Sequence, residues 1–110
     1  MCHDATILID ALLMKEKIKH QCIFVYSEEP PFYPTHSFVI AFCNDGFYRI
    51  IDVFSTKKCV YNEKFNSLKD ALIYRIKLWI KHDNKGKDNI HVFIGDHVGY
   101  PKKDFLSWFN

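Results

Sequence analysis

The sequence lacks the features that mark several large classes of protein. No apolar run approaches the roughly 18–20 residues that cross a bilayer, and no basic segment followed by an apolar stretch opens the chain, as a signal peptide would require. Only four glycines are present, and none belongs to a phosphate-binding loop. We therefore expect a cytoplasmic protein with no membrane contact and no nucleotide loop.

Charge of one sign and clustered metal ligands are scarce too. The formal net charge is +2, which is too small to indicate binding to nucleic acid or to an anionic membrane surface. The histidines and cysteines match no zinc-finger, Cys-x-x-Cys or His-Glu-x-x-His spacing. We expect reduced thiols, no metal and no other cofactor, and a protein or peptide as substrate or partner. The cysteines are Cys2, Cys22, Cys43 and Cys59, and we interpret the last three as small buried hydrophobic residues.

The chain is rich in what a packed core needs. Its 110 residues are 48% apolar and 16% aromatic, with ten Phe and six Tyr. This length and composition predict one domain over residues 1–110, with most of the aromatic rings inside. The bias toward Lys, Ile, Asn, Phe and Tyr is also typical of AT-rich genomes, such as those of phages or low-GC bacteria.

Two segments show helical periodicity. Residues 4–19 have an apolar stripe at helical spacing, with an acidic first turn and a basic last turn that suit the helix dipole. Residues 67–82 begin with Ser67 and Asp70, which resemble a capping box, and continue with a second apolar stripe. The first stripe is Ile7, Leu8, Ala11, Leu12, Met14 and Ile18, and the second is Ala71, Leu72, Ile76, Trp79 and Ile80.

Apolar runs rich in β-branched and aromatic residues predict strands over 22–27, 36–43, 47–54 and 90–94. Asn44-Asp45-Gly46 suits a three-residue hairpin loop with a bulge, the prolines of 28–35 predict a loop, and 60–66 predicts a short strand or loop. The aromatic tail, 98–110, is expected to dock on the core. The order predicts an α+β fold: a small antiparallel sheet with a central β-hairpin, an N-terminal helix packed on it, and a second helix before the last strand.

Three residues stand out by their positions. Cys2 lies at the start of the first predicted helix, where the dipole and the unpaired amides favour a thiolate. His36 opens the first hairpin strand and Asp52 closes the second. If Asn44-Asp45-Gly46 is the loop, the numbers of any two residues that lie opposite each other in the hairpin add up to 90. In this register His36 and Asp52 form a diagonal pair on one face of the hairpin. A four-residue loop would put His36 and Asp52 on opposite faces of the hairpin, but the residues of the turn favour the first register.

The first half of the chain also shows an ordered pattern: a Cys at a helix start, a helix rich in Ala and Leu, a strand, a loop, a His-led strand, a turn, and a strand ending in Asp. These parts read Cys2-His3-Asp4-Ala5, Leu12-Leu13, His36-Ser37-Phe38-Val39-Ile40 and Gly46-Phe47-Tyr48-Arg49-Ile50-Ile51-Asp52. From Cys2 to Asp52 the sequence resembles the transglutaminase-like branch of the papain-like cysteine enzymes.

The resemblance implies acyl transfer at an amide or ester carbonyl by a protease, deamidase or transglutaminase. It implies Cys2 as the nucleophile, His36 as the general base and then acid, and Asp52 as the residue that orients His36. Family members usually have a helical region before the Cys, which supplies part of the oxyanion hole, whereas only Met1 precedes Cys2 here. This difference motivates the alternative, a non-catalytic binding or inhibitor protein on the same fold, of a kind that a phage could encode.

Overall fold

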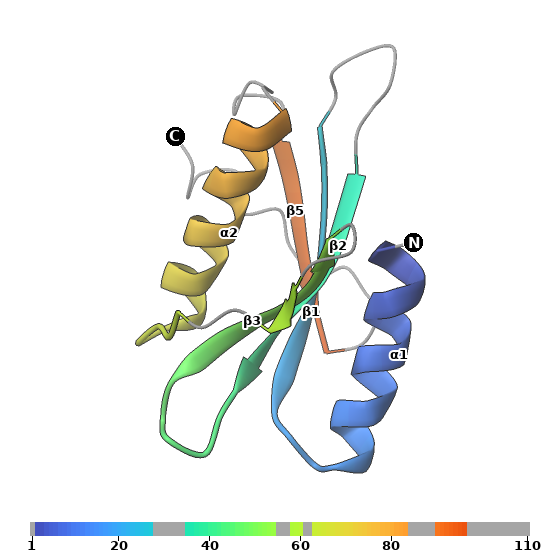
Figure 1. Ribbon diagram of the computed structural model, residues 1–110, viewed down its shortest axis with the longest axis vertical. Helices are drawn as coiled ribbons and strands as arrows, with labels where there is room; N and C mark the ends of the chain where they lie inside the picture. The colour runs from blue at the N-terminus through green and yellow to red at the C-terminus, as the bar shows by residue number, and fades with distance from the viewer. Residues whose placement is uncertain (1, 28–34, 55–57, 61–62, 84–89, 97–110) are drawn as a thin grey trace.

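The described part of the chain forms two helices and one antiparallel sheet, which confirms the predicted α+β class. The computed structural model describes residues 2–27, 35–54, 58–60, 63–83 and 90–96, and of residues 2, 3, 53, 54, 58–60 and 81–83 it describes the backbone. Figure 1 shows the arrangement. In chain order the elements are α1 (Cys2–Lys15), β1 (His20–Ser27), β2 (Thr35–Phe42), β3 (Tyr48–Phe54), β4 (Lys58–Val60), α2 (Leu68–Asp83) and β5 (Ile90–Gly95).

The sheet has five strands in the order β4-β3-β2-β1-β5, and each neighbouring pair is antiparallel. The hairpin has the predicted register, because Ala41 lies opposite Arg49 and paired numbers therefore sum to 90. The Cys43 amide donates to the Phe47 carbonyl at 2.9 Å, and Gly46 takes a φ of 86°, the left-handed conformation that the bulge requires.

Other predicted segments have mixed outcomes. The strands expected at 22–27 and 90–94 form as β1 and β5, and β4 overlaps the segment expected at 60–66 only at Val60. A loop is predicted over 28–35. Thr35 belongs to β2 instead, and the other residues of this segment lie outside the described residues. The tail over 98–110 also lies outside them.

One face of the sheet carries the hydrophobic core and is covered by α2. The predicted stripe of α2 packs there with inward-facing residues of β1, β2, β3 and β5. Burial of these side chains is the main stabilising term for this half of the molecule. The cluster contains Ile23, Val25, Phe38, Ile40, Ile50, Ala71, Leu72, Ile76, Trp79, Ile90, Val92 and Ile94.

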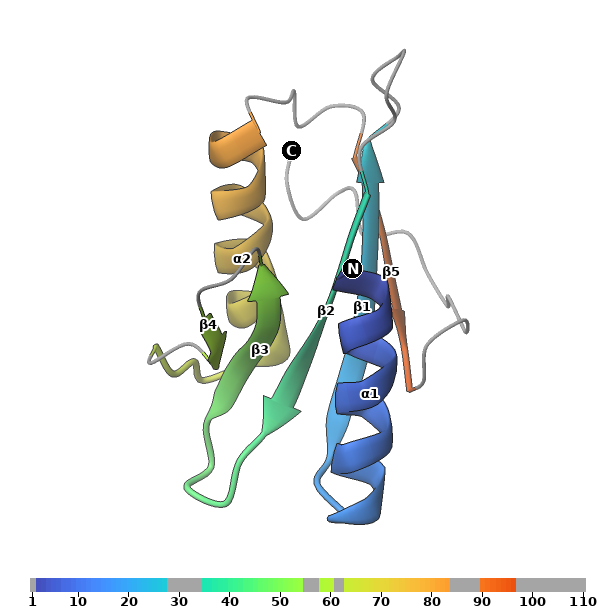
Figure 2. The same ribbon diagram turned by 45° about the vertical axis from the view of Figure 1, so that its right-hand side comes forward.

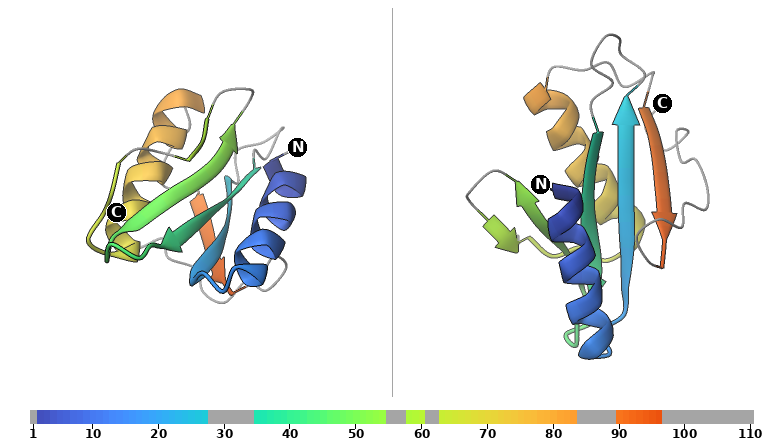
Figure 3. Two further views of the ribbon diagram at one scale, coloured as in Figure 1. Left: turned by 60° about the horizontal axis from the view of Figure 1, so that its bottom comes forward. Right: turned by 90° about the vertical axis from the view of Figure 1, so that its right-hand side faces the viewer.

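The opposite face of the sheet is covered by α1, so the sheet lies between the two helices (Figures 2 and 3). An amphipathic helix on a sheet normally buries its apolar stripe. In α1 the orientation is the reverse, because Thr6 and Asp10 are buried against the sheet. The exposed residues, which we name the outer face of α1, are Ile7, Leu8, Leu12 and Met14, with Ile18 just beyond the helix.

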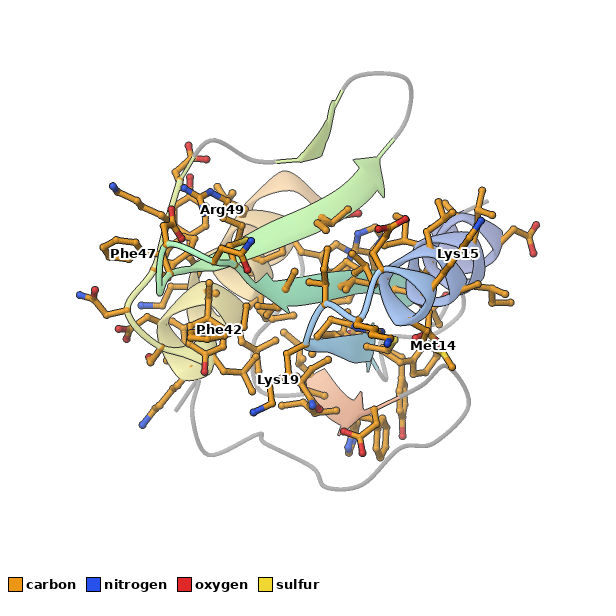
Figure 4. All side chains as sticks on the ribbon, turned by 90° about the horizontal axis from the view of Figure 1, so that it is seen from below. Met14, Lys15, Lys19, Phe42, Phe47 and Arg49 are labelled. Atoms are coloured by element: carbon orange, nitrogen blue, oxygen red, sulfur yellow. The ribbon has the colours of Figure 1, made fainter. Side chains whose placement is uncertain are left out.

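The strand residues beneath α1 explain this reversal. The buried ones include Cys22, Ser37 and Ala41, which are small or polar, together with the apolar Val39. Asp10 finds a hydrogen-bond partner there in His20, so the polar side of α1 is satisfied inside. Met14, at the end of the outer face, is labelled in Figure 4, which looks along α1 from below.

The end of α1 differs from the prediction, which carried the helix to residue 19. The helix ends at Lys15, because Lys17 takes a φ of 58° and reverses the chain. The Ile18 amide donates to the Leu13 carbonyl at 2.9 Å and the Lys17 amide to the Met14 carbonyl at 3.1 Å. This pair of bonds is a Schellman motif with Lys where Gly is usual, so the sequence had no glycine to signal it.

The start of α2 agrees with the prediction. The Ser67 hydroxyl accepts a 3.0 Å hydrogen bond from the Asp70 amide, as an N-cap should. Among the described residues, neither helix combines the length and the apolar character needed to cross a membrane.

Candidate functional site

The predicted His36–Asp52 pair is formed. His36 on β2 and Asp52 on β3 point to the same face of the sheet, as the register requires. His36 Nε2 lies 2.9 Å from Oδ1 and 2.8 Å from Oδ2 of Asp52. A carboxylate only accepts hydrogen bonds, so Nε2 carries the hydrogen of this bond and Asp52 sets the tautomer of the ring.

A third residue, Arg75 on α2, closes over this pair. Arg75 Nε donates to Asp52 Oδ2 at 2.5 Å, which makes a charge-assisted hydrogen bond. Arg75 Nη2 lies 3.0 Å from His36 Nε2. Because Nε2 already donates to Asp52, we interpret this short distance as a contact between two donors and not as a hydrogen bond.

These three residues, the core polar cluster, are sealed from solvent. The exposed fractions are 3% for His36, 0% for Asp52 and 4% for Arg75. The Arg75 guanidinium compensates the buried charge of Asp52, which a neutral imidazole could not do. Arg75 was missed in the sequence, although a charged residue between Leu72 and Ile76 in an otherwise apolar stripe was a signal.

Cys2 belongs to the helix on the other side of the sheet from the core polar cluster. α1 begins at Cys2 and covers one face of the sheet, whereas His36 and Asp52 project from the other face toward α2. The side chain of Cys2 lies outside the described side chains. The structure therefore joins two members of the predicted set, and a contact between Cys2 and His36 stays a prediction.

A second set of a cysteine, a histidine and an aspartate lies beneath α1. We name Asp10 on α1 with His20 and Cys22 on β1 the α1–β1 cluster. One ligand atom from each lies within 4.8 Å of the others. His20 and Cys22 share a face because they are two positions apart on a strand. The sequence reading missed this set, although Asp10 within an apolar stripe and the pair His20-x-Cys22 were signals.

Hydrogen bonds fix the histidine of the α1–β1 cluster. His20 Nδ1 lies 2.8 Å from the carbonyl oxygen of Ile18, so Nδ1 must donate there. His20 Nε2 lies 2.6 Å from Oδ1 of Asp10, and two lone pairs at that distance require a shared proton. The side chains of His20 and Asp10 are only 6% and 10% exposed. The pair is therefore a buried link between α1 and β1.

Cys22 is not an activated nucleophile in this environment. Burial, the negative charge of Asp10 and a hydrogen bond to that carboxylate, with a further contribution from Asp96, raise the pKa of Cys22 to about 12. A reactive cysteine needs the opposite shift, toward neutral pH or below. The α1–β1 cluster therefore has the residue types of a cysteine triad without the electrostatics of one.

Comparison with known proteins adds no relative: no protein-family model matches the sequence, and no curated protein matches it either.

Proposed function

We propose that this chain is a non-catalytic binding protein and that its binding surface is the outer face of α1. The observation that carries the proposal is the orientation of α1, which buries Thr6 and Asp10 and leaves its apolar stripe in water. A contiguous exposed apolar surface on a small domain typically marks an interaction site. The core polar cluster gives this reading separate support, because a sealed histidine held by an Asp–Arg pair cannot reach a substrate.

The exposed residues have the spacing of a helix–helix contact. Leu8 is 61% exposed, and Leu12 and Met14 are each 52% exposed. Within α1, Ile7, Ala11 and Met14 follow one another at intervals of four and three residues, as in the seam between paired helices. Ala11, which is small and exposed, lies at the centre and allows a partner helix to come close.

A second copy of the chain is the occupant that the charges favour. Asp4 lies in the first turn of α1 and Lys15 in the last, with Lys17 following. Two α1 helices packed antiparallel place the acidic end of each beside the basic end of the other. A helix of this length spans about 21 Å, so the interface is small and we expect a weak, concentration-dependent dimer.

Sedimentation equilibrium tests this assignment. We expect dimers that dissociate on dilution, and Leu8→Lys should weaken the dimer by at least about tenfold because it puts a charge in the apolar contact surface. Lys77→Glu, a charge change on the exposed side of α2, is the matched control and should leave the dimer unchanged. Asp4→Lys and Lys15→Asp should each weaken association, and together they should restore it. A monomer at every concentration up to about 1 mM would contradict the choice of occupant.

A cysteine acyl transferase with Cys2, His36 and Asp52 is the second candidate, and the His36–Asp52 bond favours it. In such an enzyme His36 Nδ1 would take the Cys2 proton, because Nε2 is engaged by Asp52. Alkylation of Cys2 by iodoacetamide, mapped by mass spectrometry at several pH values, separates the candidates. An enzyme predicts fast labelling below pH 7 that His36→Ala removes and Asp52→Asn reduces. A rate that rises through about pH 8.5 and ignores His36→Ala predicts an ordinary thiol and leaves the binding protein.

A further inference from the structure

We infer that Asp10, His20 and Cys22 form a binding site for a zinc ion. This inference goes beyond the proposed function, since the site lies beneath α1 and not on its outer face. Imidazole nitrogen, thiolate sulfur and carboxylate oxygen are the ligand types that zinc takes in proteins. A set of three, completed by a solvent molecule, is a common arrangement for this ion.

The distances come to those of a tetrahedral site if the His20–Asp10 pair opens and any pair as wide as 4.8 Å closes by about 1 Å. Ligand atoms around a tetrahedral zinc lie about 3–4 Å apart, given metal–ligand bonds of about 2.0–2.3 Å. The ligand atoms of the α1–β1 cluster lie within 4.8 Å of one another. His20 Nε2 and Asp10 Oδ1, now 2.6 Å apart with a proton between them, need to separate by under about 1 Å.

His20 is already oriented as a zinc ligand. Its Nδ1 donates to the Ile18 carbonyl at 2.8 Å, which leaves the Nε2 lone pair directed at the cluster. Metal-ligating histidines almost always make such a bond with their other ring nitrogen, because it fixes the tautomer and the ring plane. The Ile18 amide donates to the Leu13 carbonyl in the chain reversal at Lys17, so the end of α1 and the site are built together.

The charges balance when the ion binds. Zinc displaces the thiol proton of Cys22 and the proton shared by Asp10 and His20, and both protons go to solvent. The product is a dication bound by one thiolate, one carboxylate and one neutral imidazole, which is electrically neutral. Neutrality matters because the ligands are buried, with Asp10 7% and Cys22 5% exposed.

Cobalt, which reports a thiolate ligand by its absorption, is the probe for the first experiment. Titration of the purified full chain with Co²⁺ should give one equivalent of binding with a thiolate-to-cobalt charge-transfer band and tetrahedral d–d bands, which Zn²⁺ then displaces. Asp10→Asn, His20→Gln and Cys22→Ser should each weaken Zn²⁺ binding by more than about tenfold. Cys43→Ser and Cys2→Ser are matched controls and should change the affinity by less than about twofold. Absence of the charge-transfer band, or a band that survives Cys22→Ser, would overturn the site.

A second measurement uses only the wild-type chain, so its result does not depend on whether the variants fold. Zn²⁺ should protect Cys22 from alkylation under mildly denaturing conditions and leave Cys43, which is half-buried and free, unprotected. Equal protection of both thiols, or of neither, would show that the ion does not bind at Cys22. Neither measurement depends on dimer formation, so the zinc site and the proposed function can fail separately.

Discussion

The two faces of the sheet use opposite strategies to hold a helix. On one face α2 inserts Leu72, Ile76 and Trp79 into an apolar core, and His36, Asp52 and Arg75 form one sealed polar cluster there. On the other face α1 buries Thr6 and Asp10 and half-buries Ile9 and Leu13, while the outer face of α1 is exposed to solvent. Hydrophobic burial therefore dominates the attachment of α2, whereas a buried hydrogen bond between Asp10 and His20 contributes to the attachment of α1.

Because of this difference, the α2 side of the sheet contributes most to stability, and the α1 side offers a surface for recognition. A face held by apolar burial can be varied little without loss of folding, because each side chain fills a specific space. A helix held by its polar side keeps its apolar residues available for another molecule. The predictions below test this division, and they run from the largest expected effect to the smallest.

Arg75→Met should have the largest effect. It removes the cation that compensates Asp52, whose carboxylate is completely buried, and breaking such a pair costs about 3–5 kcal/mol. Urea unfolding measured by circular dichroism gives the free energy of unfolding. Lys77→Met, an exposed site on the same helix, should change it by less than about 0.5 kcal/mol. The double variant Arg75→Met with Asp52→Leu should recover most of the loss, and a loss under about 1 kcal/mol for Arg75→Met alone would contradict the buried pair.

One pair of leucine truncations compares the two helices directly. Leu72→Ala on α2 leaves a cavity in the core and should cost about 2–5 kcal/mol. Leu8→Ala on α1 removes a side chain already in water and should cost less than about 0.5 kcal/mol in the monomer. Thermal and urea unfolding at low protein concentration measure both. Equal costs for the two variants would mean that the outer face of α1 is packed in solution.

The pH dependence of the free energy of unfolding should show the raised pKa of Cys22. Its pKa is raised to about 12 in the folded chain from an ordinary value of 9.0, so the folded state keeps the thiol proton to a higher pH than the unfolded state does. This contribution is fully present below pH 9 and is lost as pH rises from 9 to 12, at up to about 1.4 kcal/mol per pH unit. Unfolding in the presence of a chelator at pH 8, 9 and 10 should show the decline, and Cys22→Ala should flatten it. A wild-type curve as flat as that of Cys22→Ala would refute the raised pKa.

Lys17→Gly should have the smallest effect and the opposite sign. Glycine takes the left-handed conformation of residue 17 without strain, so the substitution should stabilise the chain by about 0.5–1 kcal/mol. Lys15→Gly, two residues earlier at the last residue of α1, is the control and should destabilise it by about 0.5–1 kcal/mol. The difference in melting temperature between the two variants measures the Schellman motif, and equal shifts would argue against it.

Local signals were enough to predict much of this fold. The turn chemistry of Asn44-Asp45-Gly46 determined the hairpin register, and the register alone placed His36 and Asp52 on one face. Ser67 and the stripe from Ala71 to Trp79 likewise predicted where α2 begins and which side it buries. These features depend on residues close in sequence or on strand periodicity, which is why a single sequence carries them.

Tertiary structure decided what the two helices do. Periodicity marks an apolar stripe in α1, but it cannot say that small residues such as Ala41 and a partner such as His20 make the polar side the buried one. It cannot say which face of the sheet each helix covers, and so it did not place α1 opposite His36. Arg75 joined Asp52, and Asp10 joined His20, only through packing between different elements, α2 against β3 and α1 against β1. Hydrogen bonding and burial at those contacts are properties of the packed sheet, which no local pattern contains.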